Sequence, residues 1–317
     1  MNWGIIGYGE IAPSFIEGLR ASSKSNLVGI ASISSYEYLK KKRFYNDTII
    51  YSNYNDLFSD ESIEIVYICT TNQLHYKNVK EVLNAGKHVL CEKPMTPTLK
   101  ETTELCELAN KKDLFLMEGM WTRFLPAYRE AMKMISKGVI GKPKLLKIDF
   151  GFLNNWPSHR RLLNQELFGG TLLDNADYNI FLSQDVFKEM PIQIHAHATF
   201  AETGVEDACS IILKYPSGGM AQLYSSFRCQ TQQEAIIYGD KGYIKLHEYW
   251  HGTKIELNLG KRTEFIEYPF RSNGFEYEIE AVEIAIREGK TESDIIPHSV
   301  SKEVATIMDK VKKIVKN

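Results

Sequence analysis

The stretch that decides the fold of this 317-residue chain is Trp3-Gly4-Ile5-Ile6-Gly7-Tyr8-Gly9-Glu10-Ile11-Ala12. Its pattern is that of a buried strand, a glycine turn and the start of a helix. Gly7 lets the chain turn tightly, Gly9 lets the backbone approach a pyrophosphate closely, and Ala12 lets the helix pack on the strand. The first turn of such a helix offers free N–H groups and a partial positive charge to phosphates. The stretch therefore predicts a dinucleotide-binding βαβ unit, with Tyr8, Glu10 and Ile11 beside the phosphates.

Strand and helix patterns alternate through the first third of the chain. Apolar runs of strand length, separated by segments of helical periodicity, occur at 2–6, 27–32, 64–69, 88–91 and 114–117. The helical segments between them are 11–21, 75–85 and 99–110. Such alternation predicts βαβ units and a parallel sheet, and near-continuous apolar strands are typical of a sheet covered on both faces. We expect a Rossmann-type, doubly wound α/β domain over residues 1–119.

The pattern changes after residue 119 to consecutive strands joined by tight turns. Strand patterns occur at 144–152, 192–200, 208–215, 220–227, 234–238, 243–247, 254–259 and 264–268. Turn chemistry such as Pro216-Ser217-Gly218-Gly219 indicates antiparallel pairing. Helices are expected at 126–136, from about 170, at 277–287 and at 300–315. Residues 120–317 should form an α+β domain with one large, mainly antiparallel, open-faced sheet.

The composition excludes several partners. The formal net charge is −2, which gives no electrostatic reason to expect nucleic acid or an anionic membrane. The sequence has no signal-peptide pattern, and no run approaches the roughly 18 apolar residues of a membrane span. The five cysteines lack a CxxC pair or zinc-ligand spacing, so we expect free thiols, a cytoplasmic location and no metal site.

The end of the second strand bears on the choice between NAD and NADP. An NAD-specific site places Asp or Glu there to bind the ribose 2′-hydroxyl. This sequence has Ala31-Ser32-Ile33-Ser34-Ser35, with no carboxylate before Glu37. Ser32 therefore favours NADP over NAD, because nothing there repels a 2′-phosphate. No arginine stands beside Ser32 to bind that phosphate, and the nearest cations are Lys40, Lys41 and Lys42.

Two further segments carry groups suited to proton transfer. Glu92-Lys93-Pro94 places a lysine at the carboxyl end of a parallel strand, where ligands bind in open α/β sheets. Gly169-Gly170-Thr171-Leu172-Leu173-Asp174 is followed by Tyr178. On one helix, Asp174 and Tyr178 would share a face. A lysine ammonium near the phenol would lower its pKa and make Tyr178 a usable acid and base. The spacing alone is more often that of an ordinary helix pair.

Four motifs in this order resemble the Gfo/Idh/MocA family of sugar and polyol oxidoreductases over essentially the whole chain. They are the glycine turn, Ile68-Cys69-Thr70-Thr71-Asn72-Gln73-Leu74-His75, Glu92-Lys93-Pro94 and the Gly169-to-Asp174 segment. The segment 117–126, Met-Glu-Gly-Met-Trp-Thr-Arg-Phe-Leu-Pro, and Tyr178 resemble the dimeric dihydrodiol dehydrogenase and glucose-fructose oxidoreductase branch.

This resemblance implies hydride transfer between NAD(P) and a sugar, cyclic polyol or trans-diol. It implies Lys93 in the catalytic motif, Tyr178 as acid and base, and Asp174 as a substrate-side partner. It further implies a set of cofactor contacts from Thr70, Thr71, Asn72, His75, Glu92, Trp121 and Arg123. Asn175-Ala176-Asp177 and Ile33 depart from the family pattern, which leaves the substrate and the cofactor choice open.

Two alternatives to a dehydrogenase remain at this point. One is a non-catalytic NAD(P)-binding sensor, and the other is a redox-assisted glycosidase that holds NAD tightly. The retention of Lys93 and Tyr178 argues against the sensor. The exposed face of the second sheet, with Tyr224, His195 and His197, should meet a partner rather than water. We therefore expect a homodimer through that sheet.

Overall fold

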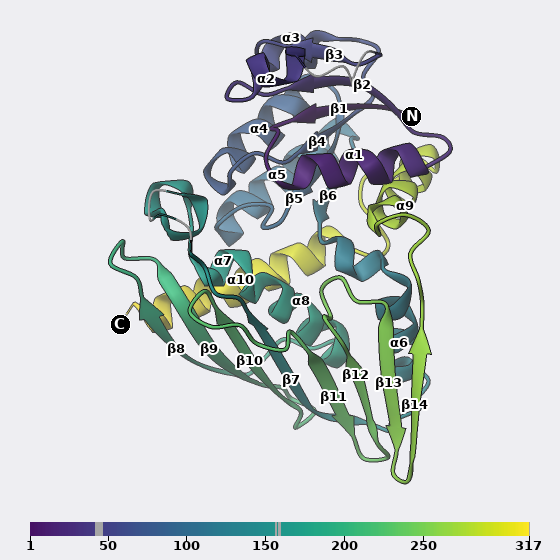
Figure 1. Cartoon of the computed structure of the whole chain (residues 1–317), viewed down its shortest axis with the longest axis vertical. Coiled ribbons are helices and arrows are strands. Elements are labelled where there is room, and N and C mark those ends of the chain that lie inside the picture. The colour runs from purple at the N-terminus through teal and green to yellow at the C-terminus, as the bar shows by residue number, and fades with distance from the viewer. Residues whose placement is uncertain (42–46, 156, 158–159, 317) are drawn as a thin grey trace. The chain divides into compact units, whose positions relative to one another are not determined.

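The computed structural model describes residues 1–41, 47–155, 157 and 160–316 (Figure 1). The chain forms two compact units, one of residues 1–121 and 271–301, the other of residues 122–270 and 302–317. The predicted domains, 1–119 and 120–317, are continuous in sequence, whereas these units are not. The reason is that residues 271–301 fold back onto the first unit.

The first unit contains the predicted parallel sheet. Its strands are β1 (Asn2–Ile6), β2 (Asn26–Ala31), β3 (Ile49–Tyr51), β4 (Ile65–Ile68), β5 (His88–Glu92) and β6 (Leu116–Gly119). Among the described residues, they pair in the order β3-β2-β1-β4-β5-β6, each pair parallel. This is the order of a Rossmann sheet, so the fold class predicted for this part is confirmed.

Helices cover both faces of this sheet. They are α1 (Ile11–Ala21), α2 (Tyr36–Lys41), α3 (Tyr54–Ser59), α4 (Asn72–Asn84), α5 (Leu99–Lys112) and α9 (Phe275–Arg287). One core contains Ile68, Val89 and Cys91 with Val79 of α4 and Leu105 of α5. The opposite face has a different, aromatic layer. There Phe15 of α1 stacks on Tyr67 with ring centroids 3.6 Å apart and also contacts Trp3 and Phe275.

The second unit contains the larger sheet. Its strands are β7 (Pro143–Gly151), β8 (Gln193–Phe200), β9 (Glu206–Lys214), β10 (Met220–Ser226), β11 (Ala235–Gly239), β12 (Tyr243–Leu246), β13 (Lys254–Leu259) and β14 (Arg262–Glu267). The order is β14-β13-β12-β11-β7-β10-β9-β8. All neighbours are antiparallel except β7 and β10, which run parallel. The mainly antiparallel sheet is therefore confirmed.

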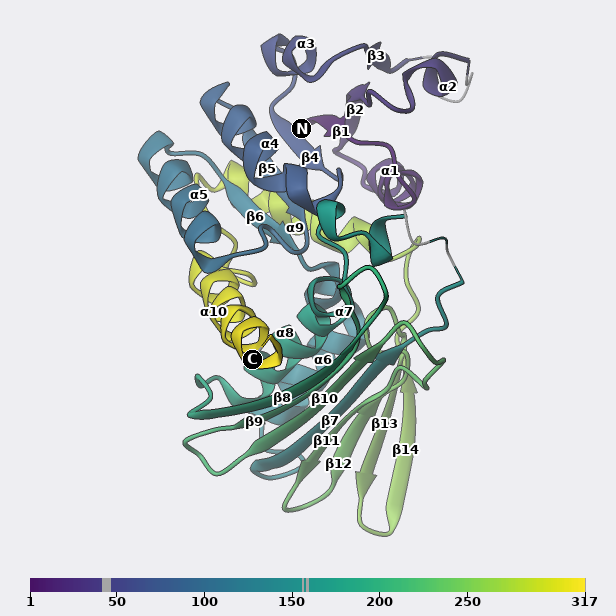
Figure 2. The same ribbon diagram turned by 90° about the vertical axis from the view of Figure 1, so that its left-hand side faces the viewer.

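Helices cover one face of this sheet, as Figure 2 shows. They are α6 (Pro126–Ser136), α7 (Thr171–Asp174) and α8 (Ala176–Phe187). Other helical elements of the chain are α10 (His298–Val315) and the short 3-10 turns η2 (Trp121–Phe124), η3 (Arg161–Leu163) and η4 (Gln165–Leu167). Ile211, Leu213, Leu223 and Ile237 are buried under the helices, as expected.

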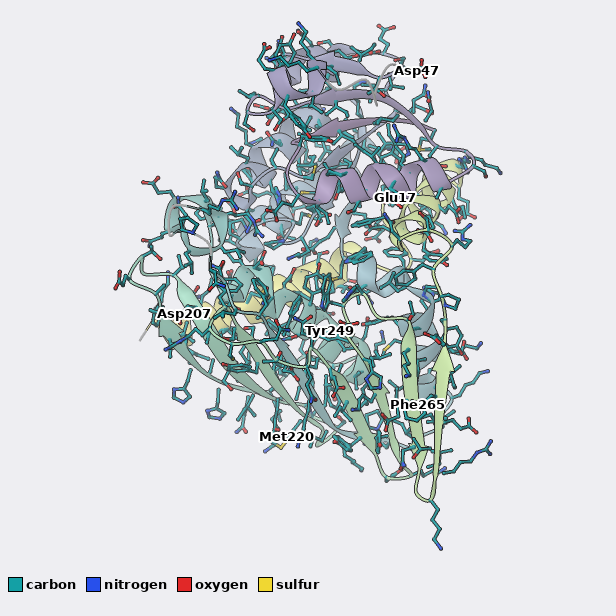
Figure 3. All side chains as sticks on the ribbon, viewed as in Figure 1. Glu17, Asp47, Asp207, Met220, Tyr249 and Phe265 are labelled. Atoms are coloured by element: carbon teal, nitrogen blue, oxygen red, sulfur yellow. The ribbon has the colours of Figure 1, made fainter. Side chains whose placement is uncertain are left out.

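The opposite face of the second sheet remains open within the described part of the chain. His195 and His197 are exposed there. Met220 and Phe265 are 39% and 62% exposed (Figure 3), and strand register puts them on the same face as Gln222 and Ile236. A shallow hollow on this face is lined by residues that include Lys147, Asp149, Gln222, Tyr224, Glu234 and Ile236. The open sheet predicted from the sequence is thus present.

One local expectation was wrong. Asp174 and Tyr178 do not share one uninterrupted helix, because α7 ends at Asp174 and α8 begins at Ala176. Asn175 interrupts the helix with φ −109° and ψ −41°, and its side-chain amide donates to the carbonyl of Phe150, 3.1 Å away. A strand carbonyl therefore holds the break in place.

None of the helices in the described ranges has the length and apolar character needed to cross a membrane.

Candidate functional site

The carboxyl ends of four neighbouring strands carry most of the predicted cofactor residues. In the order β3-β2-β1-β4-β5-β6, the direction of winding reverses between β1 and β4, and ligands of open α/β sheets bind outside the strand ends at such a point. The strand ends of β1, β2, β4 and β5 bring together Gly7, Tyr8, Gly9, Glu10, Ile11, Ser32, Thr70, Thr71, Asn72, His75, Glu92 and Lys93.

The glycine turn has the geometry that its sequence predicts. Gly7 has φ +92°, and a Cβ there would lie 2.6 Å from the carbonyl oxygen of Cys69, so a side chain would collide with the backbone directly after β4. A Cβ on Gly9 would meet no described atom within 4 Å. The N-cap residue of α1, Glu10, makes no side-chain hydrogen bond to the first turn. The turn thus presents an open approach to uncapped helix N–H groups, which fits a pyrophosphate.

The end of β2 has no carboxylate, as the sequence indicated. Ser32 is buried, whereas Ile33 beside it is 69% exposed. The hydroxyl of Ser35 donates to the carbonyl of Tyr8, 3.3 Å away, and the ring of Tyr8 lies 6.2 Å from that of Tyr38. The glycine turn and the β2 end therefore form one connected surface. Lys42, one of the cations named above, lies outside the described residues.

The segment after β4 is held by buried polar contacts. Thr71 is the N-cap residue of α4, and the side-chain amide of Asn78 donates to the hydroxyl of Thr70 at 3.0 Å. His75 is 1% exposed. Its Nδ1 lies 2.8 Å from the carbonyl oxygen of Pro94, and its Nε2 lies 3.0 Å from that of Thr70. His75 thus bridges the segments after β4 and β5.

The Lys93 segment is fixed from several sides. The phenol of Tyr67 donates to the carboxylate of Glu92. The backbone N–H of Met95 donates to Oε1 of Glu118, 2.7 Å away. With His75 bound to the carbonyl of Pro94, the backbone on both sides of Lys93 is anchored to the sheet. The Lys93–Pro94 peptide bond is cis.

Trp121 and Arg123 are close in sequence but belong to different units. Trp121 lies in the first unit and stacks on Phe275, with ring centroids 4.5 Å apart and planes 10° from parallel. Arg123 lies in the second unit and is 7% exposed.

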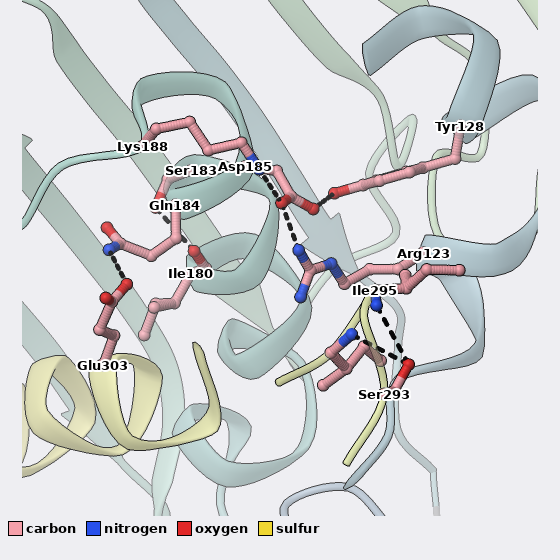
Figure 4. A network of polar contacts seen from close by, with 11 residues as sticks. Arg123, Tyr128, Ile180, Ser183, Gln184, Asp185, Lys188, Ser293, Ile295 and Glu303 are labelled. Atoms are coloured by element: carbon pink, nitrogen blue, oxygen red, sulfur yellow. Dashed lines mark hydrogen bonds and ion pairs between the residues drawn. The ribbon is translucent and has the colours of Figure 1, made fainter. Parts of the chain in front are cut away.

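The buried guanidinium of Arg123 forms part of a network (Figure 4). Its Nη2 lies 2.5 Å from Oδ1 of Asp185, and Tyr128 donates to Oδ2 of the same carboxylate at 2.6 Å. Lys188 also contacts Asp185, at 2.7 Å. Burial alone would raise the pKa of Asp185, but Arg123, Lys188 and Tyr128 together lower it below its usual range. No sequence pattern distinguished this network role from a cofactor contact.

The predicted proton-transfer groups of the second unit lie on either side of the helix break. Tyr178, in the first turn of α8, is 9% exposed. Asp174, the last residue of α7, pairs with Arg161, whose Nη1 lies 2.6 Å from Oδ1. The pairing fixes the position of the carboxyl group, whose other lone pairs can accept hydrogen bonds from hydroxyl groups.

The sequence interpretation missed an aromatic cluster around Tyr178. Phe150 lies 5.6 Å from the Tyr178 ring and stacks on Trp250 at 5.3 Å, while Trp250 lies 6.4 Å from Tyr178. The indole N–H of Trp250 donates to Gln233, and its carbonyl accepts from Thr122. These residues come from β7 and from the loop after β12, so only the folded sheet brings them to α8. Aromatic faces of this kind bind apolar ring surfaces.

Tyr249 is hydrogen-bonded to the helix that carries Tyr178, α8. Its phenol donates to the side-chain oxygen of Asn179 at 2.5 Å, and the amide of Asn179 donates to the carbonyl of Tyr224 at 3.1 Å. Burial and, after it, electrostatic interaction with Tyr178, Asp149 and Asp177 raise the pKa of Tyr249 well above its usual value. Tyr249 therefore acts as a neutral hydrogen-bond donor that orients α8.

Within the described parts of the chain, no three His, Cys, Asp or Glu side chains are grouped so that they could hold a metal ion. All five cysteines are free thiols, and Cys229 is the exposed one. Burial raises the pKa of the Cys69 and Cys91 thiols well above the usual value, so both remain neutral.

Comparison with known proteins agrees with this geometry. Residues 1–120 match the model of an oxidoreductase family with an NAD-binding Rossmann fold, and residues 128–245 match the GFO/IDH/MocA C-terminal domain. The trans-1,2-dihydrobenzene-1,2-diol dehydrogenase of Danio rerio is 32% identical to the chain over 325 residues, covering 99% of this chain and 96% of its own length. The Mus musculus enzyme of that name is also 32% identical, covering 99% and 97%.

Solved structures share the fold over the full chain. An aldose-aldose oxidoreductase from Caulobacter crescentus, complexed with glycerol, has a TM-score of 0.88 at 23% identity and covers 100% of this chain and 97% of its own. A 3-ketoreductase from Actinomadura kijaniata, with NADP and TDP-benzene, has a TM-score of 0.89 at 22% identity and covers 99% and 98%. The chain therefore belongs to the Gfo/Idh/MocA oxidoreductase family, with an NAD-binding Rossmann fold.

Proposed function

We propose that the chain is an NAD(P)-dependent dehydrogenase or reductase that acts on a CH–OH group of a sugar, a cyclic polyol or a trans-diol. The observation that carries this proposal is the match, over 99% of the chain, to a trans-diol dehydrogenase in a protein that has Lys93 at the end of β5 and a phenol in an aromatic cluster.

The roles of the site residues form part of this proposal. The bound nicotinamide would supply or accept the hydride at C4. Tyr178 takes or gives the hydroxyl proton, and Lys93 supplies positive charge that favours the phenolate. Asp174, held by Arg161, accepts a hydrogen bond from a second hydroxyl. Phe150 and Trp250 contact the apolar face of the substrate ring.

The cofactor residues follow from the strand ends. Gly7, Tyr8, Gly9, Glu10 and Ile11 would hold the pyrophosphate, and Ser32 the adenosine ribose. The nicotinamide half would be held by Thr70, Thr71, Asn72, His75, Glu92, Lys93, Trp121 and Arg123. Arg123 would act on it through the segment that also carries Trp121, since its guanidinium is bound to Asp185. The missing carboxylate at the end of β2 favours NADP over NAD.

We further propose a cytoplasmic homodimer that forms through the open face of the second sheet. The hollow on that face has both charge signs, with Lys147 beside Asp149 and Glu234. Exposed Met220 and Phe265 lie on the same face. A surface of mixed charge and apolar side chains can complement itself across a two-fold axis. Five free thiols fit a reducing compartment.

Cofactor titration and substrate screening test the proposed function. Nicotinamide fluorescence gives the affinity for NADH and NADPH, and reduction of NADP⁺ and NAD⁺ is then followed with trans-diols, polyols and aldoses. We expect saturable binding, tighter for NADPH, and turnover that Tyr178→Phe lowers by about 10²–10⁴-fold. Tight binding without any cofactor reduction would instead identify a sensor, and release of an aglycone without net reduction would identify a glycosidase.

A further inference from the structure

The ring of His75 lies between two backbone carbonyl groups in the first unit. His75 is in the first turn of α4 and is 1% exposed. Its Nδ1 lies 2.8 Å from the carbonyl oxygen of Pro94, and its Nε2 lies 3.0 Å from that of Thr70. A carbonyl oxygen can only accept a hydrogen bond, whereas a neutral imidazole carries one N–H donor and one nitrogen lone pair. Both contacts can therefore be hydrogen bonds only when both ring nitrogens carry a hydrogen.

The imidazolium form is the one that fits this geometry. In either neutral tautomer a nitrogen lone pair would face a carbonyl oxygen at 3.0 Å or less, and a buried acceptor without a donor is costly. Burial of a positive charge is also costly unless that charge is hydrogen-bonded. Here each N–H would have an acceptor, and hydrogen bonds from a charged donor are roughly twice as strong as neutral ones. The two carbonyl groups thus favour the charged ring.

Charged groups at the ends of the neighbouring strands can balance a positive ring. Glu92, at the end of β5, accepts a phenol hydrogen, and Glu118 of β6 accepts the backbone N–H of Met95 at 2.7 Å. A carboxylate that accepts such bonds is stabilised in its charged form. Lys93 supplies one positive charge beside them, and an imidazolium at His75 would supply the second.

Thiols and carboxyl groups also lie on the elements that pack against α4, which are β4, β5 and α5. Burial raises the pKa of the Cys91 thiol on β5 and of the Cys69 thiol directly after β4 well above the usual value. On α5, Glu101 and Glu104 each accept a side-chain hydroxyl hydrogen. Neither thiol therefore carries a charge near neutral pH, and both of these carboxyl groups have donors.

His88, the first residue of β5, provides a contrast within the same unit. Its Nδ1 accepts the backbone N–H of Phe115 at 3.0 Å, so that nitrogen has a lone pair and the ring is neutral. Burial lowers the pKa of His88, which also favours the neutral form. The hydrogen-bond partners thus assign different charges to His75 and His88.

We propose that His75 is a buried imidazolium and a positioning residue, which ties the segment after β4 to the Lys93 segment through two charge-assisted hydrogen bonds. Pro94 has no N–H, so its carbonyl is the group through which the backbone directly after Lys93 can be held. The Glu118 carboxylate holds the next residue, Met95, by its N–H. A ring that lost one proton would keep only one of its two bonds, and Lys93 would lose the fixed position that the proposed proton transfer needs.

This inference deepens the proposed function and rests on it only for the role of Lys93, since the charge of the ring can be measured without cofactor or substrate. In cofactor-free protein labelled with ¹⁵N-histidine, a ring nitrogen that carries a hydrogen and one that has a lone pair resonate far apart in ¹H–¹⁵N correlation spectra. We expect two protonated nitrogens for His75 at about pH 7.5, a pH unit above the ordinary histidine pKa of about 6.5. His88 should show one nitrogen without a hydrogen and serves as the internal control.

Loss of the doubly protonated signal in His75→Gln assigns that signal to His75. If this variant does not fold, the signal is assigned by elimination. Within the described residues, His247 and His298 are the other rings with acceptors near both nitrogens, so one such signal must remain in the double variant His247→Gln/His298→Gln. Absence of that signal, or a lone-pair nitrogen assigned to His75 at the same pH, would overturn the proposal.

Backbone hydrogen exchange tests whether His75 holds the Lys93 segment. In folded His75→Gln, the Met95 amide should exchange about tenfold faster than in the wild type, which corresponds to the loss of one hydrogen bond. His88→Gln is the matched control, because the bond lost there is to Phe115; it should leave the Met95 rate within about twofold of the wild type. Equal rates in wild type and His75→Gln would overturn the positioning role.

Steady-state kinetics test whether that position matters for the reaction. On a substrate that the wild type oxidises, kcat of His75→Gln should fall by about 10–100-fold, because a displacement of about 1 Å can cost that much. KM for the substrate should change by less than about threefold. An unchanged kcat in a folded His75→Gln enzyme would overturn the positioning role, whatever the charge of the ring. A substrate panel without any turnover would contradict the proposed function, and the spectra and exchange rates would still decide on His75.

Discussion

Arg123 and Asp185 form a buried ion pair in the second unit, with Nη2 of the arginine 2.5 Å from Oδ1 of the aspartate and both side chains less than a tenth exposed. Asp185 is on α8, the helix that also carries Tyr178, and Arg123 is on η2, two residues after Trp121. The pair therefore anchors α8 to the segment that leaves the Rossmann unit.

Removing the charge of Asp185 should strongly destabilise the protein. In Asp185→Asn, the guanidinium of Arg123 is left buried without its counter-charge, so the free energy of unfolding should fall by about 3–5 kcal/mol in urea denaturation. Lys188→Met removes the other cation bound to Asp185, but that lysine is 69% exposed, and the loss should be about 1 kcal/mol or less. Equal losses in the two variants would contradict the assigned network.

The same pair predicts a loss of stability in acid. The pKa of Asp185 is lowered in the folded protein, so its contribution to stability is fully present above the usual aspartate pKa of about 3.9. That contribution should be lost as the pH falls from there through the lower, folded-state pKa. Unfolding measured across this acid range should show a fall in the wild type that is smaller in Asp185→Asn; parallel curves would exclude the effect.

Two glycine substitutions should separate folding from cofactor binding. Gly7→Ala places a Cβ 2.6 Å from the carbonyl oxygen of Cys69 at φ +92°, and should cost about 1–3 kcal/mol of stability. Gly9→Ala meets open space and should change stability by less than about 0.5 kcal/mol. It should nevertheless weaken NADPH binding by about tenfold, because the pyrophosphate would approach that backbone. Thermal unfolding measures the stability of the two variants, and fluorescence titration measures their affinity for NADPH. Unchanged affinity in Gly9→Ala would place the phosphates elsewhere.

An arginine at position 33 should strengthen the preference for NADP. Ile33 is 69% exposed beside Ser32 at the carboxyl end of β2. A guanidinium there can form charge-assisted hydrogen bonds to a 2′-phosphate, which contribute about 1.5–3 kcal/mol each. We expect the ratio of NADPH to NADH affinity to rise by about tenfold or more in Ile33→Arg. Ile49→Arg, at an exposed isoleucine that begins β3, is the control; the same gain there would indicate a non-specific charge effect.

Local patterns were sufficient to predict both sheets and the edge of the first sheet that carries the proposed cofactor residues. The apolar strands of the first unit and the turns of the second are encoded within a few residues, and α1, α6 and β13 begin and end at the predicted residues. β3 was not predicted because Ile49–Tyr51 is too short to show a periodicity. The break between α7 and α8 was not predicted either, since the amide of Asn175 bonds to a carbonyl on a distant strand.

The remaining parts of the candidate site depend on contacts distant in sequence. Phe275 reaches the first unit only because residues 271–301 return to it. Phe150 and Trp250 join Tyr178 only through the pairing of β7, β11 and β12. The sequence did contain one signal, since Tyr249-Trp250-His251 is a dense aromatic turn, but nothing local connects it to α8.

The measurement that tests the central claim most directly is a comparison of the Lys93→Met variant with the wild type in two quantities, the affinity for NADPH and the turnover. Lys93 is one of several residues proposed to contact the nicotinamide half, so it is expected to matter far more for the chemical step than for the affinity of the dinucleotide. We therefore predict a dissociation constant for NADPH within about threefold of the wild-type value, with turnover lowered by about 10²–10⁴-fold on a substrate that the wild type oxidises. Wild-type turnover by Lys93→Met on that substrate would contradict the account.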